Sequence, residues 1–157
     1  MRVSFVCKSF AELTKIELYE ILHLRSLVFV VGQRITAEPE VDGDDPSYHH
    51  LMGRDEEHRI VAAARLGFGC EPVKVGRVGV RTELQRRGIG GQLMRAVHES
   101  IGDRPAEMHA QAYLESWYAS LGWQREGENF VEAEIDHVRM IRRALSRPLK
   151  HGGQGAG

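Results

Sequence analysis

A glycine-rich loop at the start of a predicted helix has the residue types of an anion-binding site. The loop reads QRRGIGG from Gln85 to Gly91, and an amphipathic segment follows it. Backbone N–H groups in the first turn of a helix have no partner within the helix, and the helix dipole adds partial positive charge there. Arg86 and Arg87 add formal charge. The pattern therefore predicts a site for a phosphate or pyrophosphate.

Two common nucleotide-binding loops do not match this segment. A P-loop requires Lys followed by Ser or Thr after its glycines, and neither pair follows them here. A dinucleotide-binding loop requires GxGxxG after an N-terminal strand, whereas Gly88 and Gly90 lie in mid-chain without a third glycine at that spacing. A third pattern, Gln or Arg followed by xxGxG after a strand ending in Val-x-Val, matches Gln85–Gly90 without a gap.

At these residues the sequence resembles the GNAT superfamily of acyl-CoA-dependent N-acyltransferases. A second segment, His109 to Trp123, is similar to the aromatic-Tyr pair followed by xxLGF in that family. The segments that resemble its ElaA-like branch are Arg25–Gln33, Glu40–Asp45 with His50, and Phe130–His137 with Met140. Together these matches cover most of residues 20 to 141.

The resemblance implies an α/β (α+β) protein with the GNAT fold. That fold has a central, mixed, mostly antiparallel and twisted sheet of about six to seven strands, splayed between strands 4 and 5 and flanked by about four helices. The residue pattern predicts strands near 3–7, 48–53, 59–68, 73–80, 105–111, 123–125 and 134–142. A crossover helix after residue 90 indicates that 73–80 and 105–111 run parallel. The glycines within 73–80 indicate a bulge or a closely approaching ligand.

The resemblance also implies that acetyl-CoA is the acyl donor. Backbone amides of Val78 and Val80 would face the thioester and the pantetheine arm, and those from Gln85 to Gly91 would hold the pyrophosphate. The expected coenzyme A site comprises Val78, Gly79, Val80, Gln85, Arg86, Arg87, Gly88, Ile89, Gly90, Gly91, Gln111 and Ser116.

Two residues are expected to be catalytic. Tyr118 matches the tyrosine that the family uses as general acid for the departing thiolate, and a phenol of pKa about 10 can give its proton to a thiolate whose conjugate acid has a pKa of about 8.5. His137, Glu40 or a chain of waters would deprotonate the acceptor amine, which then attacks the acetyl carbon directly. Alternatively, Tyr118 is a core aromatic beside Trp117, and His137 is a structural histidine.

The acceptor would be a small-molecule or peptide amine. The residues expected to bind it are Arg25, Gln33, Glu40, Asp42 and His50. Carboxylates of the acidic loop 38–46 could bind its ammonium group, although such a loop is commonly only a solvated surface segment.

Three departures from the ElaA-like pattern lie on the acceptor side. Gly32 stands where the branch has Glu, and Glu134 and Asp136 replace Gly and Pro. The change at Gly32 leaves a second hypothesis open, a non-catalytic acyl-CoA-binding module that has lost turnover.

The bulk properties restrict the remaining alternatives. We expect one domain over residues 1–145 and a flexible, Gly-rich tail over 146–157. A net charge of −1 gives no basic surplus for nucleic acid, and no apolar run predicts a signal peptide or membrane span. Cys7 and Cys70 form no paired framework, which predicts a cytoplasmic protein. Cys7 lies early in the first predicted strand and Cys70 in a turn, so neither is placed to form an acyl-enzyme intermediate. The histidine spacing predicts no metal. Trp123, expected to be exposed, and the last strands could pair with those of a second copy in a homodimer.

Overall fold

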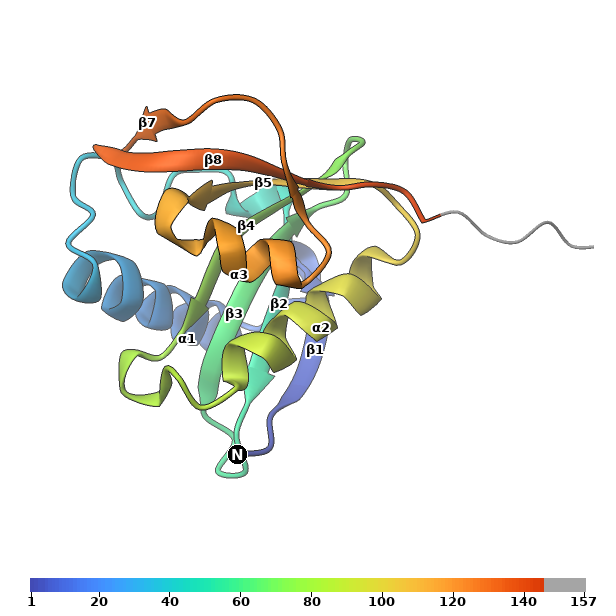
Figure 1. Ribbon diagram of the computed structural model, residues 1–157. Coiled ribbons are helices and arrows are strands. Elements are labelled where there is room, and N and C mark those ends of the chain that lie inside the picture. Colours follow the sequence, from blue (N-terminus) through green and yellow to red (C-terminus); the bar gives the residue numbers. More distant parts are fainter. Residues whose placement is uncertain (146–157) are drawn as a thin grey trace, which may run out of the picture.

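The structure is a computed structural model that describes residues 1–145. Eight strands form one sheet in the order β1-β2-β3-β4-β5-β8-β6, and β7 also pairs with β8 (Figure 1). The strands are β1 (Ser4–Ser9), β2 (His49–Arg54), β3 (Ile60–Gly67), β4 (Val73–Val80), β5 (Ala106–Gln111), β6 (Gln124–Arg125), β7 (Phe130–Glu132) and β8 (Ile135–Arg142). The expected tail 146–157 lies outside the described residues.

Helices cover both faces of this sheet. The α-helices are α1 (Lys15–Arg25), α2 (Ile89–Ile101) and α3 (Glu115–Ser120), and a π-helical segment, Ser26–Gly32, continues α1. Short 3-10 turns span Phe10–Glu12, Asp45–Ser47, Thr82–Leu84 and Ala112–Leu114. Figure 1 shows α2 and α3 in front of the sheet and α1 behind it. Within the described residues, every helix is too short or too polar to span a lipid bilayer.

Each face has its own apolar core. Leu93, Met94, Val97 and Ile101 of α2 are buried against β3, β4 and β5, as the helical spacing predicts. On the other face, Ile21, Leu24, Val28 and Phe29 pack against β2 and β3 in a second, smaller cluster. The sheet is therefore packed on both faces.

Two capping boxes precede α1. Ser9 and Glu12 form the first, with 3.3 Å between the Glu12 amide and the Ser9 hydroxyl, and it caps the 3-10 turn. Thr14 and Glu17 form a second capping box, with a corresponding distance of 3.0 Å, and α1 begins directly after Thr14. The second capping box therefore sets the start of α1.

The predicted splay lies between β4 and β5. These strands pair in parallel at only two positions, Val73 with Ala106 and Lys74 with Glu107. Beyond Lys74 the two strands separate. Between β3 and β4 the register shifts, and Arg77 adopts a φ of 51°. The glycine-containing strand thus carries the predicted bulge, which bends β4 away from β5.

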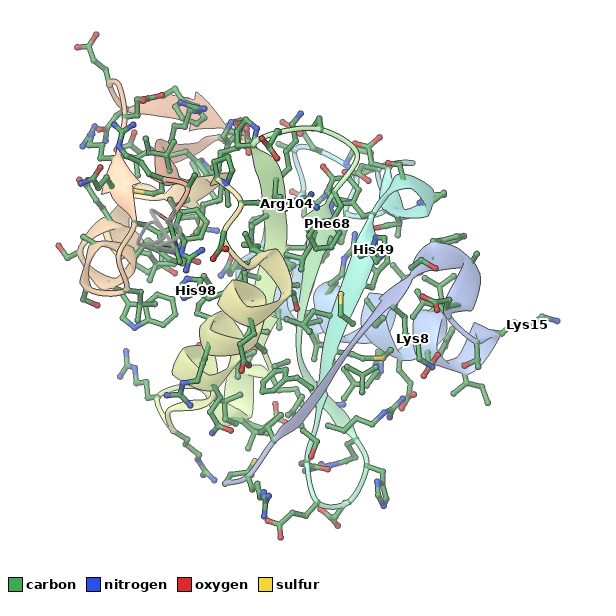
Figure 2. All side chains as sticks on the ribbon, turned by 90° about the vertical axis from the view of Figure 1, so that its right-hand side faces the viewer. Lys8, Lys15, His49, Phe68, His98 and Arg104 are labelled. Carbon is green, nitrogen blue, oxygen red and sulfur yellow. The ribbon has the colours of Figure 1, made fainter. Side chains whose placement is uncertain are left out.

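An aromatic stack covers the end at which β4 and β5 remain paired. Figure 2 shows Arg104, Phe68 and His49 next to one another. The Arg104 guanidinium lies over the Phe68 ring, 4.8 Å from its centre, and His49 meets the same ring edge-on at 5.0 Å. Arg104 precedes β5 and Phe68 follows β3, so the stack ties the two sides of the sheet together where the splay begins.

The structure corrects two details of the sequence-based fold. The sheet has eight strands because the three-residue strand β7 pairs with β8 through a two-residue turn, an element too short to give a periodic signal. The expectation of an exposed Trp123 is wrong. This side chain is 1% exposed, and its indole N–H donates to Nε2 of His98, a residue labelled in Figure 2. The homodimer prediction therefore loses one of the two features on which it rested.

Candidate active site

A cavity of about 370 Å³ opens where β4 separates from β5. Its walls come from the loop after the π-helical segment, from β4 and β5, from α3 and from the β7–β8 hairpin. Six residues of the predicted site line it together: Gln33, Glu40, Val78, Gln111, Tyr118 and His137. The splay thus brings the expected acid, base, donor-strand and acceptor residues into one cavity.

Tyr118 lies in α3, belongs to the larger apolar core and also lines the cavity. The side chain is 4% exposed, and burial raises its pKa to about 12, with a smaller contribution from Tyr113. Among the described residues, none forms a hydrogen bond with the hydroxyl. Tyr118 therefore keeps its proton at neutral pH and can donate it to a group in the cavity.

The bulged strand β4 directs a polar backbone group into the gap. The Arg81 amide donates to the Val61 carbonyl of β3, with 2.9 Å between nitrogen and oxygen. Because donors alternate along an antiparallel strand, the polar groups of Val80 point away from β3, toward the gap. The Val80 carbonyl accepts from the Gln85 side-chain amide at 3.1 Å, which ties the glycine-rich loop to the end of β4.

His137 is held in one orientation on β8. Its Nδ1 lies 2.7 Å from the Ile135 carbonyl, which can only accept, so Nδ1 carries the proton and donates. In the neutral ring Nε2 is therefore an acceptor. The nearest carboxylate to Nε2 is that of Glu132, at 4.0 Å. A neutral His137 thus has the lone pair that a general base requires.

Glu132 also contacts a second histidine. Its Oε1 accepts from Nδ1 of His109 on β5, with 2.8 Å between the two atoms. The Phe130 ring lies against both imidazoles, stacked on His137 and edge-on to His109. His109, Glu132 and His137 therefore form one cluster on the wall made by β5, β7 and β8.

Gln33 and Gln111 meet across the cavity. The Gln111 amide donates to the Gln33 side-chain oxygen at 2.8 Å, although the residues were predicted to bind different substrates. This bond joins the C-terminal end of β5 to the segment that follows the π-helix. It fixes the distance between the two walls at that point.

Arginines bind the carboxylates of the acidic loop. Oε2 of Glu40 accepts from Arg25 at 2.8 Å and from Arg77 at 2.6 Å. Both Arg65 and Arg77 contact Asp42. Much of the loop is exposed, as its composition suggests, but ion pairs tie it to the fold, because three carboxylates and three guanidiniums form one network.

Burial separates part of this network from the cavity. Arg25, Asp45 and His50 are 1%, 5% and 1% exposed, and His50 donates from Nε2 to the Asp45 carbonyl. Burial lowers the pKa of His50 more than this bond raises it, so the ring is neutral. Of the five predicted acceptor residues, only Gln33 and Glu40 line the cavity. Arg25, Asp42 and His50 lie outside its lining.

The glycine-rich loop has the geometry of an anion site. Gly88, at the N-cap of α2, has a φ of 81°, a conformation that favours glycine, and no side chain caps the helix. Arg86 and Arg87 are exposed, and neither has a partner among the described residues. Trp117 of α3 lies close to Gly90, where a Cβ in place of the glycine hydrogen would be 3.4 Å from the indole. Ser116 is on the same helix.

The departures from the ElaA-like pattern have local consequences. A side chain at Gly32 would place its Cβ 3.0 Å from the Leu27 carbonyl, so the π-helical backbone leaves little room for a larger residue. Ala133 and Glu134 have φ values of 50° and 65° in the turn between β7 and β8. Two consecutive left-handed residues are typical of a type I′ turn, in which Gly is favoured.

The sequence did not single out His109, Glu132, Arg65 or Arg77. One signal was present for the first of these, because β5 alternates apolar residues with Glu107, His109 and Gln111, which places the polar residues on one face. No comparable signal exists for the arginines, whose partners lie far away in the sequence. Among residues 1–145, no group of three or more His, Cys, Asp or Glu side chains is arranged to hold a metal ion.

Comparisons with known proteins agree on one family. Residues 33–144 match the family described as "Acetyltransferase (GNAT) domain". The Escherichia coli protein ElaA is 35% identical over 144 residues, which cover 86% of this chain and 93% of ElaA.

Solved structures give the same result. An acyl-CoA N-acyltransferase from Pseudomonas aeruginosa superposes with a TM-score of 0.80 at 35% identity, over 90% of this chain and 99% of that one. ElaA itself superposes with a TM-score of 0.81 at 32% identity, over 90% of this chain and all of ElaA. An aminoglycoside 6′-N-acetyltransferase complexed with coenzyme A shares the fold at 11% identity, with a TM-score of 0.66 over 91% of this chain and 99% of that one.

Proposed function

Because this chain belongs to the GNAT acetyltransferase family, we propose that it is an acetyl-CoA-dependent N-acetyltransferase that moves the acetyl group directly to an amine. The observation that carries the proposal is the shared cavity of Tyr118 and His137 at the splay of β4 and β5. A protonated phenol and the Nε2 atom of an imidazole whose Nδ1 is already bound thereby line one cavity. Acyl transfer to an amine requires an acid and a base.

The residues present are suited to coenzyme A. The uncapped N-terminus of α2, with Gly88 in a left-handed conformation and two exposed arginines beside it, would hold the pyrophosphate. The gap between β4 and β5 would admit the pantetheine arm, and Trp117 beside Gly90 would border its entrance. Acetyl-CoA supplies an acetyl group that is activated as a thioester.

The backbone of β4 would stabilise the transition state. The Val80 N–H faces the gap because Val80 turns its polar groups away from β3. A donor aimed at the thioester oxygen stabilises the negative charge that develops there, by about 3 kcal/mol in comparable sites. Val78 lines the same cavity and is the second candidate for this role.

His137 would accept the proton of the amine. The bond from Nδ1 to Ile135 leaves the Nε2 lone pair for this task. Glu40 is a weaker candidate, because its Oε2 already serves two guanidiniums. The amine nitrogen then attacks, and Tyr118 gives its proton to the departing sulfur.

The two cysteines are unpaired and lie outside the cavity lining. Cys7 and Cys70 are both free thiols, which agrees with a cytoplasmic setting. Neither cysteine lines the cavity, which supports a ternary complex without an acyl-enzyme. The acceptor is proposed to be a small-molecule or peptide amine.

A thiol-release assay tests this proposal. Purified protein is incubated with acetyl-CoA and a panel of amines, and free thiol and acetylated product are measured. Amine-dependent release of thiol together with acetylated amine supports the enzyme. Binding of coenzyme A without turnover of any amine favours the non-catalytic acyl-CoA-binding module. Absence of coenzyme A binding up to millimolar concentration contradicts both functions.

A further inference from the structure

Four carboxylates line the cavity, and two of them, Glu38 and Glu132, are not bound by an arginine or lysine among the described residues. Glu40 is held by Arg25 and Arg77, and Glu107 contacts Arg139 at 3.4 Å. Glu132, by contrast, has only histidine partners among the described residues. Its side chain is 41% exposed and lines the cavity, so a cation in the cavity can reach it.

The spacing between Glu132 and His137 is suited to one bridging nitrogen. Oε2 of Glu132 lies 4.0 Å from Nε2 of His137, too far for a direct hydrogen bond. A nitrogen that donates two hydrogen bonds of about 2.9 Å at roughly a right angle spans about 4 Å between its acceptors. Both atoms are acceptors, since Nδ1 of His137 donates to Ile135 and a carboxylate only accepts.

His109 determines which way the carboxylate points. Its Nδ1 donates to Oε1 of Glu132, and this bond leaves Oε2 on the side of His137. His109 lies on β5 and Glu132 on β7, and both strands flank β8. The carboxylate is therefore held between two strands and does not depend on the substrate for its position.

From this geometry we infer that Glu132 binds the acceptor as a primary alkylammonium ion, beside Nε2 of His137, and that His109 is the positioning residue for that carboxylate. The inference rests on the proposed function and names its substrate class. An alkylamine is protonated at neutral pH, as lysine is, with a pKa of about 10. Such a substrate must be bound as a cation and must then lose a proton. Glu132 would bind the cation, and His137 would accept the proton. One N–H proton moves to Nε2 of His137, and the electron pair stays on the substrate nitrogen, which becomes neutral.

Two kinds of nucleophile should differ in how strongly they depend on the Glu132 charge. An alkylammonium gains a charge-assisted hydrogen bond from Glu132, whereas a nucleophile that is already neutral at pH 7 gains little from the carboxylate. Hydroxylamine is such a neutral nucleophile and is small enough to enter any acceptor site. Removal of the Glu132 charge should therefore impair only the alkylamine.

A binding experiment tests this without requiring turnover. n-Butylammonium, with n-butanol as its neutral isostere, is titrated into the full chain saturated with coenzyme A, and imidazole signals of His109 and His137 are followed by NMR. We expect saturable shifts with butylammonium alone and at least a tenfold loss of affinity in Glu132→Gln. The matched control is Glu134→Gln, which removes the same charge from an exposed site in the same hairpin and should leave the affinity unchanged. Equal affinity in E132Q and the unaltered chain overturns the inference.

A second variant pair tests the positioning role of His109. His109→Ala should weaken butylammonium binding several-fold, and His109→Asn should restore it, because the Asn amide can donate from near the position of Nδ1. His109 is exposed, so neither change should alter the urea midpoint. If H109A and H109N bind butylammonium with the same affinity, the His109–Glu132 hydrogen bond does not determine that affinity, and the positioning role of His109 is refuted.

Kinetics distinguish this inference from the proposed function. The unaltered enzyme is assayed with its best alkylamine and with hydroxylamine, after subtraction of the uncatalysed reaction. E132Q should raise KM for the alkylamine about tenfold and leave kcat/KM for hydroxylamine within twofold. Equal losses with both nucleophiles, or a larger effect from Glu38→Gln on the exposed loop of the cavity, overturn the assignment of Glu132. Absence of turnover with every amine contradicts the proposed function and leaves the binding experiment to decide the inference.

Discussion

The carboxylate of Asp45 accepts a hydrogen bond from the buried guanidinium of Arg25, with 2.7 Å between Oδ1 and Nη1. The same oxygen accepts from Arg65 of β3 at 3.0 Å. Arg25 ends α1, so this one carboxylate joins the helix behind the sheet to a central strand. The loop that forms one wall of the cavity is therefore held by ion pairs, and its position depends on their charge.

Removal of the Asp45 charge should lower the free energy of unfolding. In Asp45→Asn two buried guanidiniums lose a shared partner, and breaking a buried ion pair costs about 3 kcal/mol. We expect the urea midpoint to fall accordingly. Asp44→Asn is the control, because the exposed side chain of Asp44 has no partner among the described residues and its loss should cost under about 0.5 kcal/mol. Equal stability of the two variants would show that the network contributes little.

The same network predicts a loss of stability in acid. Burial opposes the charged form of Asp45, but the Arg25 and Arg65 contacts outweigh it and hold its pKa below the ordinary value. The Arg65 hydrogen bond also lowers the pKa of Asp42. The unfolded chain then binds these protons more tightly, so the stabilisation is complete above about pH 4 and is lost as the pH falls toward the folded-state values. Urea midpoints from pH 5 to pH 2.5 should fall less steeply in D45N than in the unaltered chain.

His98 predicts a second pH dependence in a milder range. Burial, with a smaller effect from Arg142, lowers the pKa of His98, whose Nε2 accepts the Trp123 indole proton. The unfolded chain therefore takes up a proton more readily, and stability falls as the pH drops below about 6.5, the ordinary histidine pKa. The difference between urea midpoints at pH 7.5 and 5.5 should shrink in His98→Gln. It should persist in His23→Gln, a change at a histidine that contacts Tyr19 on the helix surface.

Local features of the chain were predictable from sequence because they depend on backbone conformation. The glycines around Gly88 and within residues 73–80 indicated the helix N-terminus and the bulge, and both are present. Apolar spacing predicted the buried face of α2. The splay between β4 and β5 and the family were predicted from the resemblance of short sequence motifs, such as Gln85–Gly91, to those of the GNAT superfamily.

Contacts between distant segments were not predictable in this way. The acidic loop gives no sign of which of the many arginines bind it, because Arg25, Arg65 and Arg77 meet it only through the fold. The cluster around Glu132 likewise depends on the registers of β5 and β7 against β8. The burial of Trp123 was not predictable for the same reason, since its hydrogen-bond partner His98 lies on another element.

The turn between β7 and β8 contains backbone strain at Glu134 that a substitution by glycine should relieve. Glu134 has a φ of 65°, a conformation that glycine adopts freely and other residues adopt at a cost. Glu134→Gly should therefore stabilise the protein by about 1 kcal/mol, seen as a higher urea midpoint. Glu134→Gln keeps the strain and should show no gain. A lower midpoint in E134G would mean that the flexibility added to the unfolded chain outweighs the relief.

Tyr118→Phe separates catalysis from binding and from stability. Because no described residue bonds the Tyr118 hydroxyl, its removal leaves no orphaned partner, and the urea midpoint should hardly change. The thiolate then departs without its acid, so kcat should fall at least about 100-fold while coenzyme A affinity stays within twofold. Tyr113→Phe is the control on the preceding turn, since Tyr113 is 72% exposed and should tolerate the change. With its pKa at about 12, Tyr118 stays protonated through pH 10, so the unaltered enzyme should show no loss of rate from its ionisation below that pH. Full activity of Y118F would refute the acid assignment and leave protonation of the thiolate to water.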